Sequence, residues 1–232
     1  ETAFLVKTAA GRYALRWFTP HKEVALCGHA TLASAFVIFT TLDASLDVAR
    51  FDTKSGELTV RKSEERLALA LPASGAEPFT APDGFAAALA DAAGGAKPAE
   101  LYFCAKGGGG AAALMAVWPS PADIAALKPT GALDEVLLRV QTASLQATAR
   151  GDGKPYDFVS RFFAPYLGVQ EDPVTGSAHG VLVPFWARRL EKKKLHARQL
   201  SPRGGDLWCT DEGAQVLLEG NCVPYLRGEI EV

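Results

Sequence analysis

The chain has 232 residues, of which 48% are hydrophobic and 22% charged, and its formal net charge is -2. This length and composition suit one large globular domain or two domains of about a hundred residues each. The slightly negative charge argues against nucleic acid as a partner, because nucleic-acid-binding surfaces concentrate Lys and Arg. The longest apolar stretch, residues 30–42, is too short to span a bilayer. With no visible signal peptide, we expect a cytoplasmic protein that does not bind membranes.

The first elements in chain order are a strand and a buried helix. The chain opens on the strand-like run Glu1 to Val6 without an initiator Met, so we expect that residues upstream of it are missing from the sequence. The segment 30–39 is apolar nearly all round, which predicts a helix enclosed on every side. The alternating or apolar segments 57–61 and 67–71 predict strands.

A change of composition follows these strands. Residues 72–98 are rich in Ala, Gly and Pro, which favours an inter-domain connection, and we place the boundary near Gly75. The predicted domains are residues 1–75 and 76–232, and the last strand could return to the first domain. Within the second, residues 85–93 predict a short surface helix and residues 107–110 a hairpin turn.

An internal repeat relates the two halves. The box Arg16-Trp17-Phe18-Thr19-Pro20 recurs at residues 161–165 as R-F-F-A-P, and each box is followed by a glycine that opens an apolar segment, Gly28 or Gly176. A second glycine follows 28 residues after Gly28, at Gly56, and 29 residues after Gly176, at Gly205. Three markers in one order indicate a duplicated unit with a buried helix wrapped by strands. Within the second helix, Pro184 is expected to bend or shorten it.

The two glycine-opened helices predict a site for an anion. A helix start presents unpaired backbone N–H groups and the positive end of the helix dipole. If the repeat is a pseudo-two-fold, both helix starts can face one cleft and hold a carboxylate. His29 lies on one side, and Glu171 and Asp172 lie on the other, which suits proton transfer. Taken alone, a residue such as His29 is more often a helix-start residue than a catalyst, Asp172 could be only a turn residue, and Ser177 could be only a helix-start residue; their pairing across the repeat favours the functional interpretation.

Cysteines and histidines give weaker signals. The four cysteines have no C-x-x-C spacing and the four histidines no H-E-x-x-H pattern, so we predict free thiols and no metal site. A thiolate at Cys27 is chemically possible, but Thr175 occupies the equivalent place in the second unit, so a two-thiol mechanism lacks its partner. We expect His179 to be structural, and His21 and His196 to lie on the surface.

Three segments resemble one known family. Residues 1–4 (E-T-A-F), 16–31 (R-W-F-T-P to C-G-H-A-T) and 172–178 (D-P-V-T-G-S-A), with a later R-G-G at 203–205, are similar to the motifs of PhzF-like proteins of phenazine biosynthesis. The resemblance covers essentially the whole chain. It implies an α+β fold of two pseudo-symmetric diaminopimelate epimerase-like domains, each a β-roll or barrel around a central buried helix. It also implies an isomerase that works without a metal or an organic cofactor. Because members of the family are often dimeric, we expect a homodimer.

The same resemblance assigns roles to residues. It implies four catalytic residues, namely Glu1, His29, Asp172 and Ser177, with the glutamate moving a proton between carbons of a small carboxylate-bearing substrate, either amino-acid-like or dihydroaromatic. Substrate-binding residues are expected at Gly28, Thr175, Gly176, Arg203 and Gly204. Two alternatives stay open, namely a cysteine-based amino-acid epimerase and a non-catalytic scaffold that binds protein partners.

Overall fold

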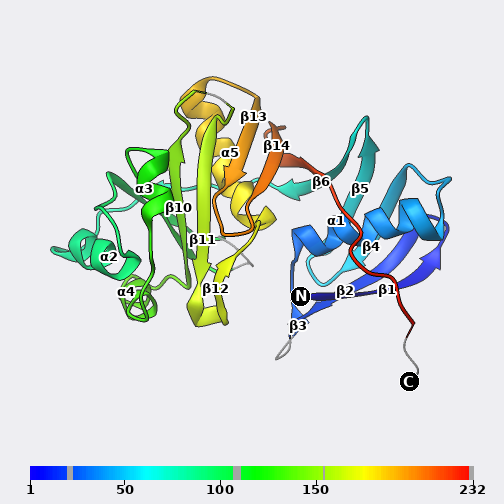
Figure 1. The fold of residues 1–232 in the computed structure, drawn as a ribbon, viewed down its shortest axis with the longest axis horizontal. Coiled ribbons are helices and arrows are strands. Elements are labelled where there is room, and N and C mark those ends of the chain that lie inside the picture. Colours follow the sequence, from blue (N-terminus) through cyan, green and yellow to red (C-terminus); the bar gives the residue numbers. More distant parts are fainter. Residues whose placement is uncertain (20–22, 107–110, 154, 230–232) are drawn as a thin grey trace.

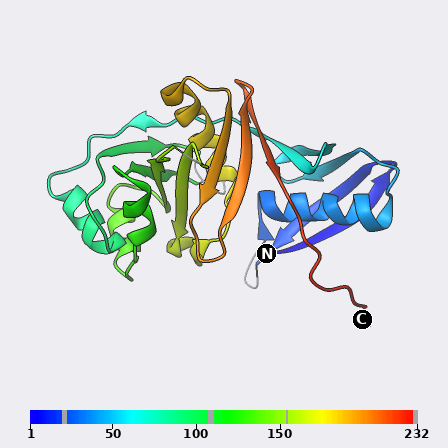
Figure 2. The ribbon, with the colours of Figure 1, turned by 45° about the horizontal axis from the view of Figure 1, so that its top comes forward.

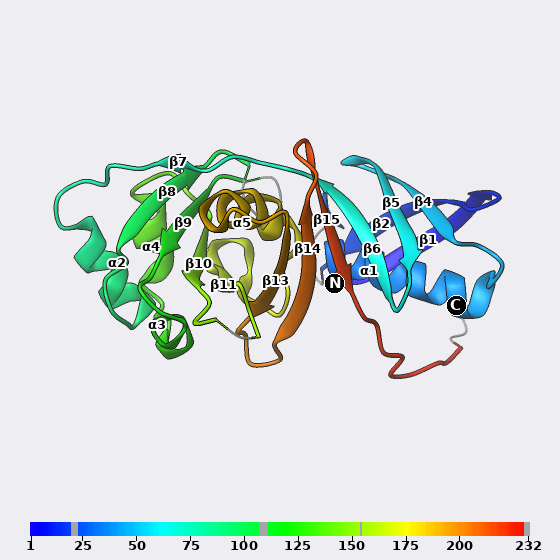
Figure 3. The ribbon, with the colours of Figure 1, turned by 90° about the horizontal axis from the view of Figure 1, so that it is seen from above.

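The computed structural model describes residues 1–19, 23–106, 111–153 and 155–229. They form two lobes side by side, with strands passing from one to the other through the middle (Figures 1 and 3). Among the described residues, no helix combines the length and apolarity needed to cross a membrane.

Within the described residues, the first lobe contains helix α1 and the strands that precede residue 75. Helix α1 spans Gly28–Val37 and continues in a wider π-helical segment, Ile38–Leu42. The strands are β1 (Thr2–Ala9), β2 (Arg12–Phe18), β3 (Glu23–Val24), β4 (Val48–Thr53), β5 (Gly56–Ser63) and β6 (Arg66–Pro72).

The second lobe is larger. Its helices are α2 (Phe85–Ala93), α3 (Pro121–Ala126), α4 (Leu133–Leu138) and α5 (Gly176–Leu190), with a 3₁₀ turn at Pro165–Leu167. Its strands are β7 (Glu77–Pro78), β8 (Glu100–Cys104), β9 (Ala113–Val117), β10 (Ser144–Arg150), β11 (Phe158–Ala164), β12 (Val169–Asp172), β13 (Lys194–Gln199), β14 (Gly205–Asp211) and β15 (Gln215–Gly220).

Strand pairing confirms the internal repeat. In the first lobe the order is β1-β2-β4-β5-β6, with β2 and β4 parallel and β3 paired to β2; in the second it is β10-β11-β13-β14-β15, with β11 and β13 parallel and β12 paired to β11. The repeat markers fall at equivalent places, because Arg16–Phe18 of the first box lie in β2, Arg161–Ala164 of the second lie in β11, and the glycines that follow begin α1 and α5. Gly56 and Gly205 begin β5 and β14.

The two units share one sheet at their junction. β15 pairs antiparallel with β6, from Gln215 opposite Pro72 to Gly220 opposite Leu67. Figure 3 shows these strands between the lobes, and Figure 2 shows the chain beyond β15 passing alongside α1. The strand nearest the C-terminus is therefore hydrogen-bonded to the N-terminal unit, while the domain boundary at residue 75 stays a prediction.

The two central helices differ in how fully they are covered. In α5, Val181, Leu182 and Val183 are all buried. The helix does not end at Pro184 but continues to Leu190. In α1, by contrast, Ala33 and Val37 are exposed along one stripe, so the prediction of a helix enclosed on every side was too strong. Apolar composition favours burial but does not say which neighbours provide it.

Other sequence predictions can be checked in the same way. The four cysteines are free thiols, and the helix predicted at residues 85–93 is α2, with Phe85 and Leu89 buried. His196 is half-buried rather than on the open surface, because its ring stacks on Trp208 with the centroids 4.9 Å apart. His21 and the turn at residues 107–110 lie outside the described residues.

Gly94 offers a test of the packing around α2. It ends the helix with φ +67°, and a Cβ at this position would lie 2.2 Å from the carbonyl oxygen of Lys128. The left-handed backbone alone costs a non-glycine residue ~1–3 kcal/mol, and the clash adds to it. Urea unfolding should therefore show a larger decrease in the free energy of unfolding for Gly94→Ala than for Gly84→Ala. At Gly84 φ is +77°, but nothing lies within 4 Å of the added carbon. Equal losses would mean that the Lys128 contact relaxes.

Candidate active site

The two glycine-opened helices meet at their starts. A Cβ on Gly28 would lie 3.5 Å from the Cα of Gly176, and the converse distance is the same. Cys27 and Thr175 hold the N-cap positions in extended conformation, and within the described residues neither caps its helix through its side chain. The N–H groups and positive dipole ends of both helices therefore converge on one place.

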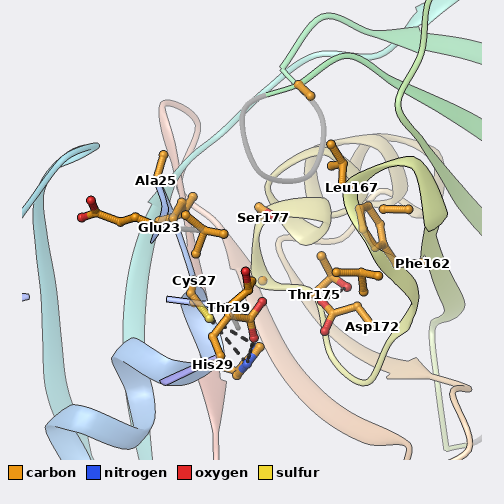
Figure 4. Close-up of a pocket in the computed structure, with 18 residues that line it drawn as sticks. Thr19, Glu23, Ala25, Cys27, His29, Phe162, Leu167, Asp172, Thr175 and Ser177 are labelled. Atoms are coloured by element: carbon orange, nitrogen blue, oxygen red, sulfur yellow. Dashed lines mark hydrogen bonds and ion pairs between the residues drawn. The ribbon is translucent and has the colours of Figure 1, made fainter. Parts of the chain in front are cut away.

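Three side chains gather on the α1 side of this junction. The His29 Nε2 lies 3.2 Å from Glu1 Oε2 and 3.5 Å from Cys27 Sγ. Glu1 precedes β1, while Cys27 and His29 belong to the loop and first turn of α1, so two segments far apart in sequence build the cluster. Figure 4 shows His29 at its centre, with dashed lines marking its contacts.

The cluster favours its charged forms. The Cys27 side chain, and then the Glu1 carboxylate, raise the pKa of His29 to about 10. In turn the hydrogen bond from His29 is the main reason that the pKa of Glu1 is lowered. At neutral pH this side of the site therefore carries an imidazolium beside an ionised carboxylate.

The opposite side is built from the loop before α5. Thr175 Oγ1 donates a hydrogen bond of 2.5 Å to Asp172 Oδ2, and the Thr175 N–H donates to Gln199 Oε1 at 2.8 Å. The Gln199 side chain also donates to the Asp172 carbonyl at 2.7 Å. Gln199 lies in β13, so a neighbouring strand fixes the loop that carries Asp172.

Asp172 differs electrostatically from Glu1. Burial raises its pKa above the ordinary value, although the hydrogen bond from Thr175 and the charge of His29 oppose that rise. The site thus contains one carboxyl group whose pKa is lowered and another whose pKa is raised. Two carboxyl groups whose pKa values are shifted in opposite directions typically have different roles in acid–base chemistry.

A cavity of about 270 Å³ lies between the two sides. The polar residues that line it include Glu1, Glu23, Cys27, His29, Asp172 and Ser177. The first turns of both helices contribute Gly28 and Gly176. Its walls are largely apolar and consist of Val24, Ala25, Leu26, Ala111, Phe162, Ala164, Leu167 and Val169. Figure 4 shows Asp172, Thr175 and Ser177 across the cavity from Cys27 and His29.

Most residues singled out from the sequence come together here. Glu1, His29, Asp172, Ser177, Gly28, Thr175 and Gly176 all line the cavity. Gly204 instead lines a neighbouring cavity, which shares Gly28, His29 and Gly176 with the first. Arg203 is exposed, and it is absent from the described linings of both cavities.

Sequence reasoning missed some contributions. Glu171 was a candidate for acid–base work, but its carboxylate is paired with Arg161 at 2.7 Å. The contact of Cys27 with His29 was not foreseen, and neither was the apolar wall, because both depend on how the loops fold back. The repeated box arginine was a signal that could have pointed to the Arg161 pairing.

One group in the described part of the chain could hold a metal ion. The ligand atoms of Glu1, Cys27 and His29 lie within 4.8 Å of one another. A thiolate, an imidazole and a carboxylate form a donor set that suits a borderline-soft ion such as zinc. Binding would require His29 to lose the proton that its neighbours hold.

Comparisons with known proteins identify the family. The family model described as phenazine biosynthesis-like protein matches residues 1–228. An uncharacterized isomerase of Pseudomonas aeruginosa is 42% identical over all of this chain and 83% of its own length. A crystal structure of a PhzC/PhzF protein from Clostridium difficile, described as putative, superposes with a TM-score of 0.85 at 34% identity, covering 99% of this chain and 82% of that one.

A more distant structure extends the likeness of fold. A hydroxyproline epimerase from Agrobacterium vitis superposes with a TM-score of 0.59 at 12% identity, covering 96% of this chain and 72% of that one. At that identity the likeness concerns the fold alone, and it confirms the epimerase-like architecture expected from the sequence. With the family model matched almost end to end and a 42% identical relative, the chain belongs to the PhzC–PhzF family of phenazine biosynthesis-like, isomerase-like proteins.

Proposed function

We propose that this chain is a cofactor-independent isomerase or epimerase that moves a C–H proton in a small carboxylate-bearing substrate. The observation that carries the proposal is the gathering of Glu1, His29 and Asp172 around the meeting point of two helix starts. Such groups can serve as base and acid on opposite sides of a bound molecule.

The cavity supports a substrate with a charged end and an apolar body. The carboxylate would lie at the starts of α1 and α5, where N–H groups and the imidazolium of His29 favour negative charge. The carbon skeleton would lie against the apolar wall, which includes Leu26, Phe162 and Val169. An amino-acid-like or a dihydroaromatic carboxylate meets both requirements.

The proton would move as follows. The ionised carboxylate of Glu1 removes a proton from a carbon, and the electron pair of the broken C–H bond spreads into the neighbouring conjugated group as an enolate-like anion. The helix starts and His29 stabilise that charge. Return of the proton from Glu1 to another carbon gives an isomer. Delivery of a proton from an initially protonated Asp172 to the opposite face of the same carbon gives an epimer, and it leaves Glu1 protonated and Asp172 ionised until both exchange protons with water.

A thiol mechanism is the nearest alternative, because Cys27 lines the cavity. At the matching position of α5 stands Thr175, whose hydroxyl is already bonded to Asp172. A single thiol would need another group as its partner. The carboxylate mechanism needs no thiol chemistry, so the two differ in how they respond to loss of Cys27.

Proton NMR in deuterium oxide tests the proposal on a panel of amino acids and dihydroaromatic carboxylates, including a dihydro-hydroxyanthranilate. We expect deuterium to appear at a carbon next to the carboxylate or along the ring of the true substrate. The Cys27→Ala variant should keep most of this exchange, with Cys104→Ala as the matched buried-cysteine control. Complete loss in Cys27→Ala alone would favour the thiol mechanism, and no exchange in any compound would favour a scaffold.

A further inference from the structure

Each half of the molecule contains an arginine–glutamate pair of the same geometry. In the first, Arg16 Nε and Nη2 donate to the two carboxylate oxygens of Glu23 at 2.8 and 2.9 Å. In the second, Arg161 Nε and Nη2 donate to the two oxygens of Glu171 at 2.7 and 2.9 Å. Such two-pronged bonds fix direction as well as distance.

The two pairs occupy equivalent positions in the repeat. Both arginines belong to the repeated box, in β2 and β11, and both glutamates lie five positions before the glycine that opens the helix. Glu23 lies in β3, which pairs with β2, and Glu171 lies in β12, which pairs with β11. Each pair therefore ties the segment leading into a helix start to the strand beside it.

We propose that Arg16–Glu23 and Arg161–Glu171 are matched clamps, made of positioning residues, and that each one holds one loop of the active site against the neighbouring strand of its own unit. The first loop, residues 24–27, leads to His29, and the second, residues 172–175, carries Asp172. Neither arginine is in the described lining of the cavity, so both act through the groups they hold. The catalytic consequence rests on the proposed function, whereas the positioning itself does not.

The second clamp is the stronger of the two. The Arg161 and Glu171 side chains are 9% and 16% exposed, and Arg161 Nη1 also donates to the carbonyls of Ile124 and Leu127 at 3.2 and 2.7 Å. Arg16 is 60% exposed, and Glu23 has Lys54 as a second cation. Solvent screens an exposed pair, whereas a buried pair has no substitute partner.

The charge-preserving variant Arg161→Lys tests the second clamp, since lysine cannot form the two-pronged bond. We expect kcat for deuterium exchange to fall at least tenfold with KM changed less than threefold, and Arg16→Lys to have a smaller effect. The control is Arg189→Lys, which disrupts another two-pronged pair, with Glu100, away from the cavity. Glu171→Gln serves as the second variant if Arg161→Lys does not fold.

A second readout needs no substrate. Carbon NMR of labelled aspartate follows the titration of the Asp172 carboxyl, which faces His29 and Glu1. We expect its midpoint to move by more than half a pH unit in Arg161→Lys and to stay in place in Arg189→Lys. An unmoved midpoint in the folded variant would overturn the clamp, even if no exchange substrate were found. A moved midpoint with wild-type kcat would overturn its catalytic role alone.

Discussion

An Asp172→Asn variant is expected to lose proton-exchange activity by about 10²–10⁴-fold while unfolding at the same temperature as the parent chain or slightly above it. Asparagine has nearly the same shape and can still accept the Thr175 hydroxyl hydrogen bond, but it cannot take or give the proton. The activity loss therefore reports chemistry rather than misfolding. Exchange NMR and thermal unfolding together measure the two effects.

The expected gain in stability follows from the raised pKa of Asp172, which burial causes. A raised folded-state pKa means that ionisation is harder in the folded protein than in the unfolded chain, so the carboxylate lowers stability once the pH exceeds its ordinary pKa of 3.8. At neutral pH, a neutral amide removes that penalty. A destabilising group at this position is typical of a residue kept for function.

Asp157→Asn is the matched control, and it should lower stability and leave exchange activity unchanged. Although burial raises its pKa, the hydrogen bond from Lys192 and that from the His196 N–H outweigh this, and the net shift is downward. Its ionised form therefore stabilises the fold above its ordinary pKa, and the variant should unfold more easily but keep exchange activity. If Asp172→Asn lost stability and activity together, Asp172 would be structural.

Much of the site could be predicted from the sequence because its signals are local. The repeated box contains the end of a strand, Gly28 and Gly176 begin helices, and Gly56 and Gly205 begin strands. A few neighbouring residues determine each of these boundaries. Nearly equal spacing of these markers in the two halves then indicated equivalent folds. Strand pairing confirmed that equivalence element by element.

What could not be predicted depends on contacts between distant segments. Glu171 appeared as a titratable neighbour of Asp172, yet the antiparallel return of β12 on β11 places it on Arg161. The exposed stripe of α1 reflects which strands cover it, a fact absent from its composition. Pro184 was expected to bend or shorten its helix; α5 is not shortened, since it continues beyond Pro184 to Leu190 with most of its residues buried, while the bend stays a prediction.

His29 is expected to remain an imidazolium throughout neutral pH and to titrate near 10, where an ordinary histidine titrates at 6.5. The Cys27 side chain is the largest cause and Glu1 the next, so Cys27→Ala should lower the midpoint by more than one unit. Nitrogen-detected NMR of labelled histidine measures it directly. His179 is the internal reference, since burial lowers its pKa to about 4 and it should not respond.

The raised pKa of His29 also fixes how stability depends on pH. A group whose pKa is higher in the folded state stabilises the protein fully below its unfolded value, here 6.5, and that contribution disappears as the pH rises toward 10. The parent chain should therefore lose stability between these two pH values. Over the same pH range, the Cys27→Ala variant should lose less stability than the Cys104→Ala variant. His29 is 42% exposed, so solvent reduces the size of the effect but not its sign. A parent midpoint near 6.5 would show that Cys27 and Glu1 do not hold the charge, and the imidazolium would then have no part in stabilising an enolate at neutral pH.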